Sequence, residues 1–132
     1  MLKTLPILAV SAVAIACGGS AAAAAHDVTG SIAVSQYMGT RGLGTECTGQ
    51  GGYDDIHAGS AVVVKDEGGK ILATSQLDPG KITRLGECTF AFSVRSVPDA
   101  KFYQFEVSHR GQVTYAKKDL SDAGWTVKLT LS

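Results

Sequence analysis

Three histidines and two adjacent aspartates are the residues of this chain whose types could support chemistry in the folded protein. The histidines are His26, His57 and His109, and the aspartates are Asp54 and Asp55. A Ser-His-Asp site could be assembled on paper, but no Gly-x-Ser-x-Gly elbow or comparable local signature supports one. The sequence therefore predicts no catalytic residue and does not favour an enzyme.

The loop that carries the aspartates is a first alternative for metal binding. Asp54, Asp55 and the carbonyl groups of this glycine-rich loop could bind Ca²⁺, because hard cations prefer oxygen ligands. The Asp-x-Asp-x-Asp-Gly spacing of calcium loops is missing, and His57 is isolated in sequence from the other histidines. A small metal-binding protein or metal-dependent enzyme built on this loop stays an alternative, and no cofactor is predicted.

His26 offers a second metal-binding alternative, which depends on how the chain is processed. If cleavage follows Ala25, His26 becomes the N-terminal residue, and its free amine and imidazole would suit Cu(II). A further ligand would have to come from His57 or His109, and no spacing in the sequence predicts which. The copper alternative disappears if the chain is instead lipidated at Cys17.

Cys47 and Cys88 are expected to form a disulfide bond. The chain has three cysteines, and Cys17 is accounted for by lipidation or by removal, which leaves an even pair in an exported protein. Two cysteines so far apart lack the paired short spacing of a structural zinc site. Closing the loop between Cys47 and Cys88 would stabilise the fold by about 4 kcal/mol in the chain-entropy model.

The elements that would position these residues are β-strands. Residues 86–109 contain two runs of alternating apolar side chains, first Cys88, Phe90, Phe92 and Val94 and then Tyr103, Phe105 and Val107. This period of two is typical of strands with one buried face. Between the runs, Pro98 fixes φ and Asp99 can bond its own backbone, as in a turn. We expect the two runs to form the core hairpin of the domain.

The rest of the chain after the N-terminal segment is predicted to form further short strands. Turn signals recur about every ten residues, and no segment shows a convincing helical period, although residues 118–124 have room for one helical turn. This spacing predicts an all-β fold, a seven- to eight-stranded antiparallel β-sandwich of prealbumin or immunoglobulin-like type. The expected core is Val62, Val64, Phe90, Phe92, Tyr103, Phe105, Trp125 and Val127.

Residues 1–25 are expected to direct export rather than to join the fold. Lys3 precedes an apolar run at residues 5–16, which is too short to span a bilayer as a helix. Residues 14–17 resemble a bacterial lipobox, which would make Cys17 a lipid anchor, and the alanine tract ending at Ala25 offers a signal-peptidase site. Two routes stay open, a lipoprotein signal plus tether and a freely secreted form.

Charge and length exclude some classes of function. The 12 basic and 12 acidic residues balance and are interspersed, so the sequence has no basic stripe for nucleic acid. The remaining part, residues 26–132, has roughly the length of one domain that can fold alone. We expect contact with the membrane only through a possible lipid at Cys17.

Two sets of motifs resemble known exported proteins. Residues 59–72 are similar to the first hairpin of transthyretin-like sandwiches, the carboxypeptidase regulatory and collagen-adhesin B-type repeats, in Gly59, Val62, Val64, Asp66 and Gly69-Lys70-Ile71-Leu72. A second set resembles small, mostly uncharacterised exported proteins of actinobacteria, many of them predicted lipoproteins, in Cys47-Thr48-Gly49, Tyr53-Asp54-Asp55-Ile56, Cys88-x-Phe90-x-Phe92 and Val107-Ser108-His109-Arg110-Gly111. The first resemblance implies architecture and the second implies export, and neither implies chemistry. The isopeptide triad of adhesin repeats cannot be carried over, because the chain contains no Asn.

The preferred interpretation is a cell-envelope or secreted interaction module whose partner is an unknown protein or a cell-wall component. Residues 39–59 form a long connection that holds seven of the 16 Gly and the richest mix of side-chain chemistry. Long ordered loops often carry function, and the expected disulfide would anchor this one and lower its ordering cost on binding. The candidate binding residues are Tyr53, Asp54, Asp55 and His57. The alternative is that the loop only caps one end of the sandwich, with Tyr53 covering the edge of the core.

Overall fold

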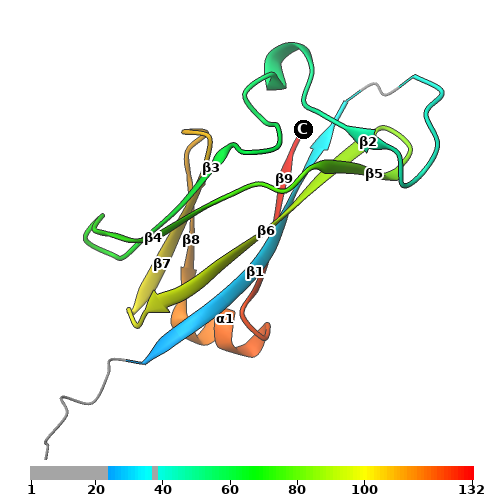
Figure 1. The fold of residues 1–132 in the computed structure, drawn as a ribbon. Coiled ribbons are helices and arrows are strands. Elements are labelled where there is room, and N and C mark those ends of the chain that lie inside the picture. The colour runs from blue at the N-terminus through cyan, green and yellow to red at the C-terminus, as the bar shows by residue number, and fades with distance from the viewer. Residues whose placement is uncertain (1–23, 37–38) are drawn as a thin grey trace, which may run out of the picture.

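The computed structural model describes residues 24–36 and 39–132, which form two β-sheets packed face to face (Figure 1). The all-β sandwich predicted from the sequence is confirmed. The expected lipidation residue Cys17 and nearly all of the expected signal segment lie outside the described residues, as do Tyr37 and Met38. Within the described ranges, no helix is long and apolar enough to cross a membrane.

The first sheet has five strands, and all but one of its neighbouring pairs are antiparallel. Its order is β2 (Glu46–Cys47), β5 (Gly80–Arg84), β6 (Glu87–Pro98), β1 (Ala25–Ser35) and β9 (Thr126–Leu131). The pair of β1 with β9 is parallel, which differs from the fully antiparallel sandwich that we expected. Parallel strands need a long connection, and here all the other described strands lie between the two along the chain.

The second sheet has four strands and is antiparallel throughout. Its order is β4 (Ile71–Gln76), β3 (Ala61–Lys65), β7 (Phe102–Val107) and β8 (Gln112–Ala116). The 3₁₀-helix η1 (Gly51–Tyr53) precedes β3, and α1 (Lys117–Asp122), the short helix expected near residues 118–124, joins β8 to β9. The described part of the chain thus has nine strands, among them the two-residue β2, which is too short to show any alternation.

The strands β6 and β7 do not form the core hairpin that we expected from residues 86–109. β6 pairs with β5 and β1 in the first sheet, whereas β7 pairs with β3 and β8 in the second. Residues 99–101 therefore carry the chain from one sheet to the facing sheet. The expectation fails because alternation fixes the face that a side chain occupies, and strands on either inner face of a sandwich alternate in the same way.

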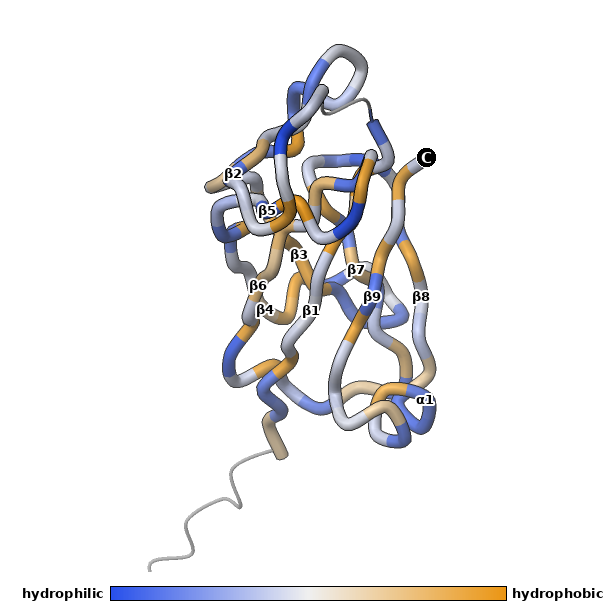
Figure 2. The backbone as a smooth tube through the Cα atoms, turned by 90° about the vertical axis from the view of Figure 1, so that its right-hand side faces the viewer, coloured by the Kyte–Doolittle hydropathy of each residue, from blue (hydrophilic) through white to orange (hydrophobic). Residues whose placement is uncertain are grey.

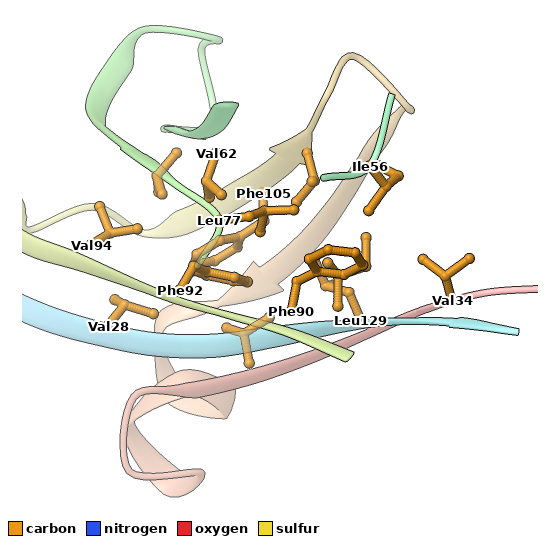
Figure 3. Close-up of a cluster of buried hydrophobic side chains, with 14 of the residues drawn as sticks. Val28, Val34, Ile56, Val62, Leu77, Phe90, Phe92, Val94, Phe105 and Leu129 are labelled. Atoms are coloured by element: carbon orange, nitrogen blue, oxygen red, sulfur yellow. The ribbon is translucent and has the colours of Figure 1, made fainter. Parts of the chain in front are cut away.

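The inner faces of the two sheets form one hydrophobic core (Figure 3). The core side chains predicted from the sequence are buried, except for Trp125. Trp125 is only partly buried, because it precedes β9 with a φ of 60° and stacks on His26 at the edge of the core. Phe92 lies over Gly30, its partner on β1, and a Cβ at Gly30 would come within 2.7 Å of the ring atom Cε2. Glycine at this position makes room for the phenylalanine ring.

The expected disulfide bond joins Cys47 of β2 to Cys88 of β6, with their Cα atoms 6.0 Å apart. Both residues are buried. Gly80 of β5 lies against the bond, since a Cβ there would be 2.6 Å from the Phe90 ring and 2.8 Å from Cys88 Sγ. The bond fastens the outermost strand of the first sheet to its centre. It is consistent with an extracellular location.

Candidate functional site

The loop that we expected to present a binding surface folds against the turn between β7 and β8. The Gly49 N–H donates to the Ile56 carbonyl at 2.8 Å, which closes the loop around η1. Ile56 is completely buried and belongs to the core. A Cβ at Gly49 would lie 2.6 Å from the Ile56 carbonyl oxygen, so the closure needs glycine here. The middle of the loop is therefore a packed part of the fold.

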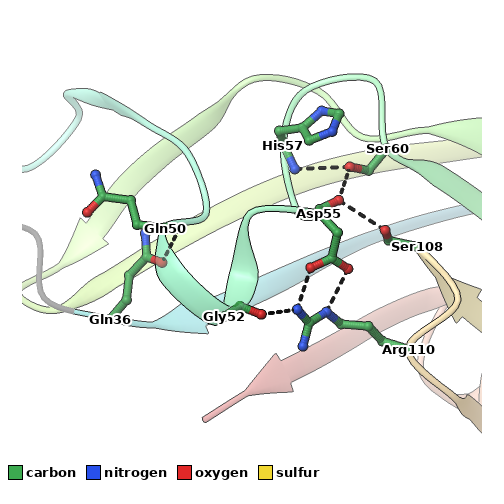
Figure 4. A network of polar contacts seen from close by, with 8 residues as sticks. All are labelled: Gln36, Gln50, Gly52, Asp55, His57, Ser60, Ser108 and Arg110. Atoms are coloured by element: carbon green, nitrogen blue, oxygen red, sulfur yellow. Dashed lines mark hydrogen bonds and ion pairs between the residues drawn. The ribbon is translucent and has the colours of Figure 1, made fainter.

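Asp55 forms the centre of this packing through an ion pair with Arg110 (Figure 4). Arg110 Nε donates to Asp55 Oδ2 at 2.7 Å, and Arg110 Nη2 donates to the other carboxylate oxygen and to the Gly52 carbonyl. The guanidinium also lies over the Tyr53 ring, 5.1 Å from its centroid. The hydrogen bonds from Arg110 lower the pKa of Asp55 from 3.8 to about 2, and the same bonds raise the pKa of Arg110.

The backbone of Asp55 is held as firmly as its side chain. Its carbonyl oxygen accepts a hydrogen bond from Ser60 Oγ at 2.6 Å and another from Ser108 Oγ at 3.0 Å. Ser108 and Arg110 both belong to the turn between β7 and β8, so two separate contacts join this turn to the loop. Asp55 and Tyr53 thus fix the loop, as in the alternative in which the loop caps the sandwich, although the sequence did not indicate Arg110 as their partner.

The other two candidate binding residues do not converge with them on a shared site. Asp54 is exposed, and the His57 ring contacts its own loop, with Nδ1 2.8 Å from the Ala58 carbonyl oxygen. Among residues 24–36 and 39–132, no three His, Cys, Asp or Glu side chains come together in a way that could hold a metal ion. In this part of the chain Asp54 and Asp55 therefore have no third acidic or histidine side chain beside them, and the Asp55 carboxylate is already bound by Arg110.

His26 lies far from the other two histidines. Its ring stacks on Trp125 with centroids 3.7 Å apart, and its Nε2 is 3.2 Å from Asp99 Oδ1. Lys117 and then His26 lower the pKa of Asp99 by hydrogen bonding to its carboxylate. This cluster lies beside α1, at the opposite end of the sandwich from the loop with His57 and the turn after β7 with His109 (Figure 1). The structure therefore does not bring His26 together with the second ligand that the copper alternative requires.

A groove of about 210 Å³, which the sequence did not predict, lies between β8 and β9. Figure 2 shows these two strands running along the same side of the molecule, each at the edge of its own sheet. The apolar side chains that line the groove include Phe105, Val113, Tyr115, Leu129 and Leu131. Because the inner face of the sandwich reaches the surface here, the groove opens onto the hydrophobic core.

Val113 shows most clearly that the inner face is uncovered. Val113 lies opposite the buried Phe105 in the pairing of β7 with β8, so it belongs to the inward-facing set of β8. Its side chain is nevertheless 45% exposed. On the other side of the sandwich the chain passes from β4 in the second sheet to β5 in the first alongside β6, and the Asp78 N–H donates to the Ala91 carbonyl at 2.8 Å. One side of the sandwich is therefore closed by the chain, and the side at β8 and β9 is open.

The charges along the groove are of one sign. Its lining contains Arg110 and Lys128 and no acidic side chain. Arg110 is already paired with Asp55, whereas Lys128 is exposed and forms no ion pair or hydrogen bond with any residue that the structure describes. The one sequence signal for this site was β8 itself, an edge strand of five residues without a charge or a proline.

A second depression lies on the outer face of the first sheet, next to β9. Three of its polar side chains bond one another, since Thr83 Oγ1 donates to Glu87 Oε1 at 3.0 Å and lies 2.7 Å from Thr89 Oγ1, while Lys128 lines both this depression and the groove. Thr83, Glu87 and Thr89 already have partners, whereas the exposed apolar surface of the groove is covered by no residue that the structure describes. The groove is therefore the better candidate for a binding site.

No protein family, curated protein or solved structure matches the chain. Function is therefore inferred from the fold and from the groove between β8 and β9.

Proposed function

We propose that the protein is an exported interaction module, secreted or anchored at the outer face of the cell membrane, that binds another protein through the groove between β8 and β9. The observation that carries this proposal is the 45% exposure of Val113, an inward-facing side chain at the edge of the core. Covering apolar surface of this kind contributes about 25 cal/mol per Å². A surface that opens onto the core favours a specific partner more than scattered surface hydrophobics do.

The proposed compartment rests on the N-terminal segment and the cysteines of the sequence. The apolar run and the two processing motifs within residues 1–25 support export, and a buried disulfide supports an oxidising compartment. A lipid at Cys17 would place the module on the membrane surface, and cleavage after Ala25 would release it. Intact mass of the processed protein distinguishes these two forms. We also propose that the protein is related to the exported actinobacterial proteins that it resembles in sequence.

The groove also replaces the loop as the proposed contact surface. Asp55 and Tyr53 are engaged by Arg110, so a partner that used them would first have to break these contacts. Val113 and Leu131 can be covered without breaking any hydrogen bond. The lower cost of binding favours the groove.

A pair of matched variants tests the proposal by affinity capture. Val113→Asp places a charge in the groove, whereas Thr114→Asp places the same charge one residue on, at an exposed position of the opposite face. The immobilised wild-type protein should retain a partner from solubilised envelope and secreted fractions, Val113→Asp should lose it, and Thr114→Asp should retain it. The purified partner must then bind the purified protein with the same pattern. Equal retention by both variants, or no partner at all, would contradict the proposed surface.

A further inference from the structure

We infer that the groove binds an extended segment of the partner protein, which adds as a strand to the free edge of β8 and carries an acidic side chain near Lys128. This inference rests on the proposed function and specifies the chemistry of the partner. It follows from three properties of the groove, namely its free strand edges, its alternating apolar lining and its charge.

The free edge of β8 is the better template for an added strand. β8 and β9 are both last in their sheets, so each leaves one row of backbone N–H and C=O groups without a strand partner in the described part of the chain. Natural edge strands are commonly protected by a lysine, a proline or another charge. β9 carries Lys128, whereas β8 has the sequence Gln-Val-Thr-Tyr-Ala and carries no such protection. We therefore assign the hydrogen bonds of the incoming strand to β8.

The length and lining of the groove determine the side chains of that strand. β8 has five residues and β9 has six, so the paired part of the ligand is about as long. Successive side chains of a strand point to opposite faces, so every second side chain of the ligand would enter the groove. There it would meet Phe105, Leu129 and Leu131, which are apolar. The ligand should therefore carry apolar residues at alternate positions, as in other cases of strand addition.

The charge of the groove determines the sign of the flanking residues. Lys128, which stands between the buried Val127 and Leu129 on β9, is a free cation at the rim between the groove and the outer face of the first sheet, and the lining of the groove offers no carboxylate to a basic ligand. An acidic side chain on the ligand can pair with Lys128 at this exposed position. Such a pair contributes more to the choice of partner than to affinity, because exposed ion pairs are screened by solvent.

Selection from a display library of random peptides tests this inference without knowledge of the natural partner. The protein is expressed as the full chain, purified in its processed form and used as the target. The selected peptides should alternate apolar residues and contain an acidic residue. Val113→Asp should weaken their binding by about tenfold or more, while Thr114→Asp should leave the affinity unchanged. Thermal unfolding of both variants establishes that each is folded.

Charge reversal at Lys128 tests the acidic side chain of the ligand, and amide hydrogen exchange tests the assignment of the added strand to β8. Lys128→Glu should shift the selected peptides from acidic to basic, whereas Lys81→Glu, at an exposed position of β5, should not. Bound peptide should slow hydrogen exchange of amides in β8. Slowing confined to β9, to β4 or to the loop at residues 39–59 would overturn the assignment to β8.

The failures of the inference and of the proposed function are distinguishable. One outcome is that capture of the partner depends on Val113 while no peptide is selected. In that case the groove binds the surface of a folded protein, so the strand inference is wrong and the proposed function stands. If the protein self-associates in sedimentation experiments and Val113→Asp abolishes this, the occupant is a second copy, and the inference is wrong. If neither a partner nor a peptide depends on Val113, both are wrong.

Discussion

Arg110 is the residue that connects the loop to the groove, because its side chain contacts both. Its guanidinium binds Asp55 and lies over Tyr53, and the same side chain lines one part of the groove. A ligand carboxylate that reached Arg110 would compete with Asp55. If the groove is occupied as proposed, Arg110 is the residue through which a ligand would act on the packing of the loop.

Replacement of Arg110 should alter the stability of the protein in acid. The folded-state pKa of Asp55 is lowered from 3.8 to about 2, so the stability from this pair is present above about pH 4 and is lost as the pH falls towards 2. Asp55 is 38% exposed, so the pair contributes only about 1 kcal/mol or less. We expect Arg110→Ala to lower the unfolding free energy by that amount at neutral pH and by less near pH 2.

Urea unfolding at several pH values checks this expectation. Lys118→Ala removes an exposed ion pair with Asp122 on α1 and serves as the control, with little effect expected at any pH. An Arg110→Ala variant as stable as the wild type at neutral pH would show that the ion pair with Asp55 does not contribute to folding.

Gly30 and Phe92 form a pair whose substitution tests the packing of the core. Phe92→Ala leaves a cavity in the buried core and should cost about 3–5 kcal/mol. Gly30→Ala places a methyl group against the Phe92 ring and should cost about 1–3 kcal/mol through overpacking. The double variant should be more stable than the sum of the single losses indicates, because the ring that the new methyl group would strike is gone. Strictly additive losses from chemical denaturation would contradict this contact.

At the scale of the elements, the sequence predicts strands better than their pairing. The alternation in residues 86–109 correctly places Phe90, Phe92 and Phe105 on inner faces. It does not reveal that β6 and β7 belong to different sheets, because a short connection can join strands within a sheet or across two sheets. The parallel pair of β1 with β9 is equally hidden, since its partners lie at the two ends of the described chain.

The disulfide was predictable from the sequence, whereas the Asp55–Arg110 ion pair and the groove were not, for physical reasons. A cysteine pair in an exported chain has few alternatives, so its chemistry specifies its partner. An aspartate has many possible partners, and Arg110 lies 55 residues beyond Asp55. The groove arises because two strands happen to be last in their sheets, and no local pattern records the order of strands.

Loss of the disulfide should destabilise the whole domain. Cys47 and Cys88 are 41 positions apart, and closing a loop of this length contributes about 4 kcal/mol in the chain-entropy model. We expect the double variant Cys47→Ser/Cys88→Ser to lose about that much unfolding free energy, as should the reduced wild-type protein. Thiol counting on the denatured, unreduced wild type should find no free thiol from this pair. Two free thiols there would contradict the bond.

At the scale of the whole molecule, the sandwich is closed on one side and open on the other. The crossing from β4 to β5 covers one side, and the disulfide fastens β2 at the edge of the first sheet. At the open side, α1 joins β8 to β9 at one end only, and the inner face between these strands lies uncovered. The proposed recognition therefore belongs to the open side, whereas the closed side is held by the chain and the disulfide.

Photo-crosslinking in intact cells tests this placement most directly. A photoreactive side chain replaces Val113 in the groove, Thr114 on the opposite face of β8 or Asp54 in the loop, each of which is exposed. We predict a discrete covalent adduct with one partner protein from position 113 and none from positions 114 and 54. An adduct from position 54 without one from position 113 would contradict this placement. It would indicate that the partner contacts the loop instead of the groove.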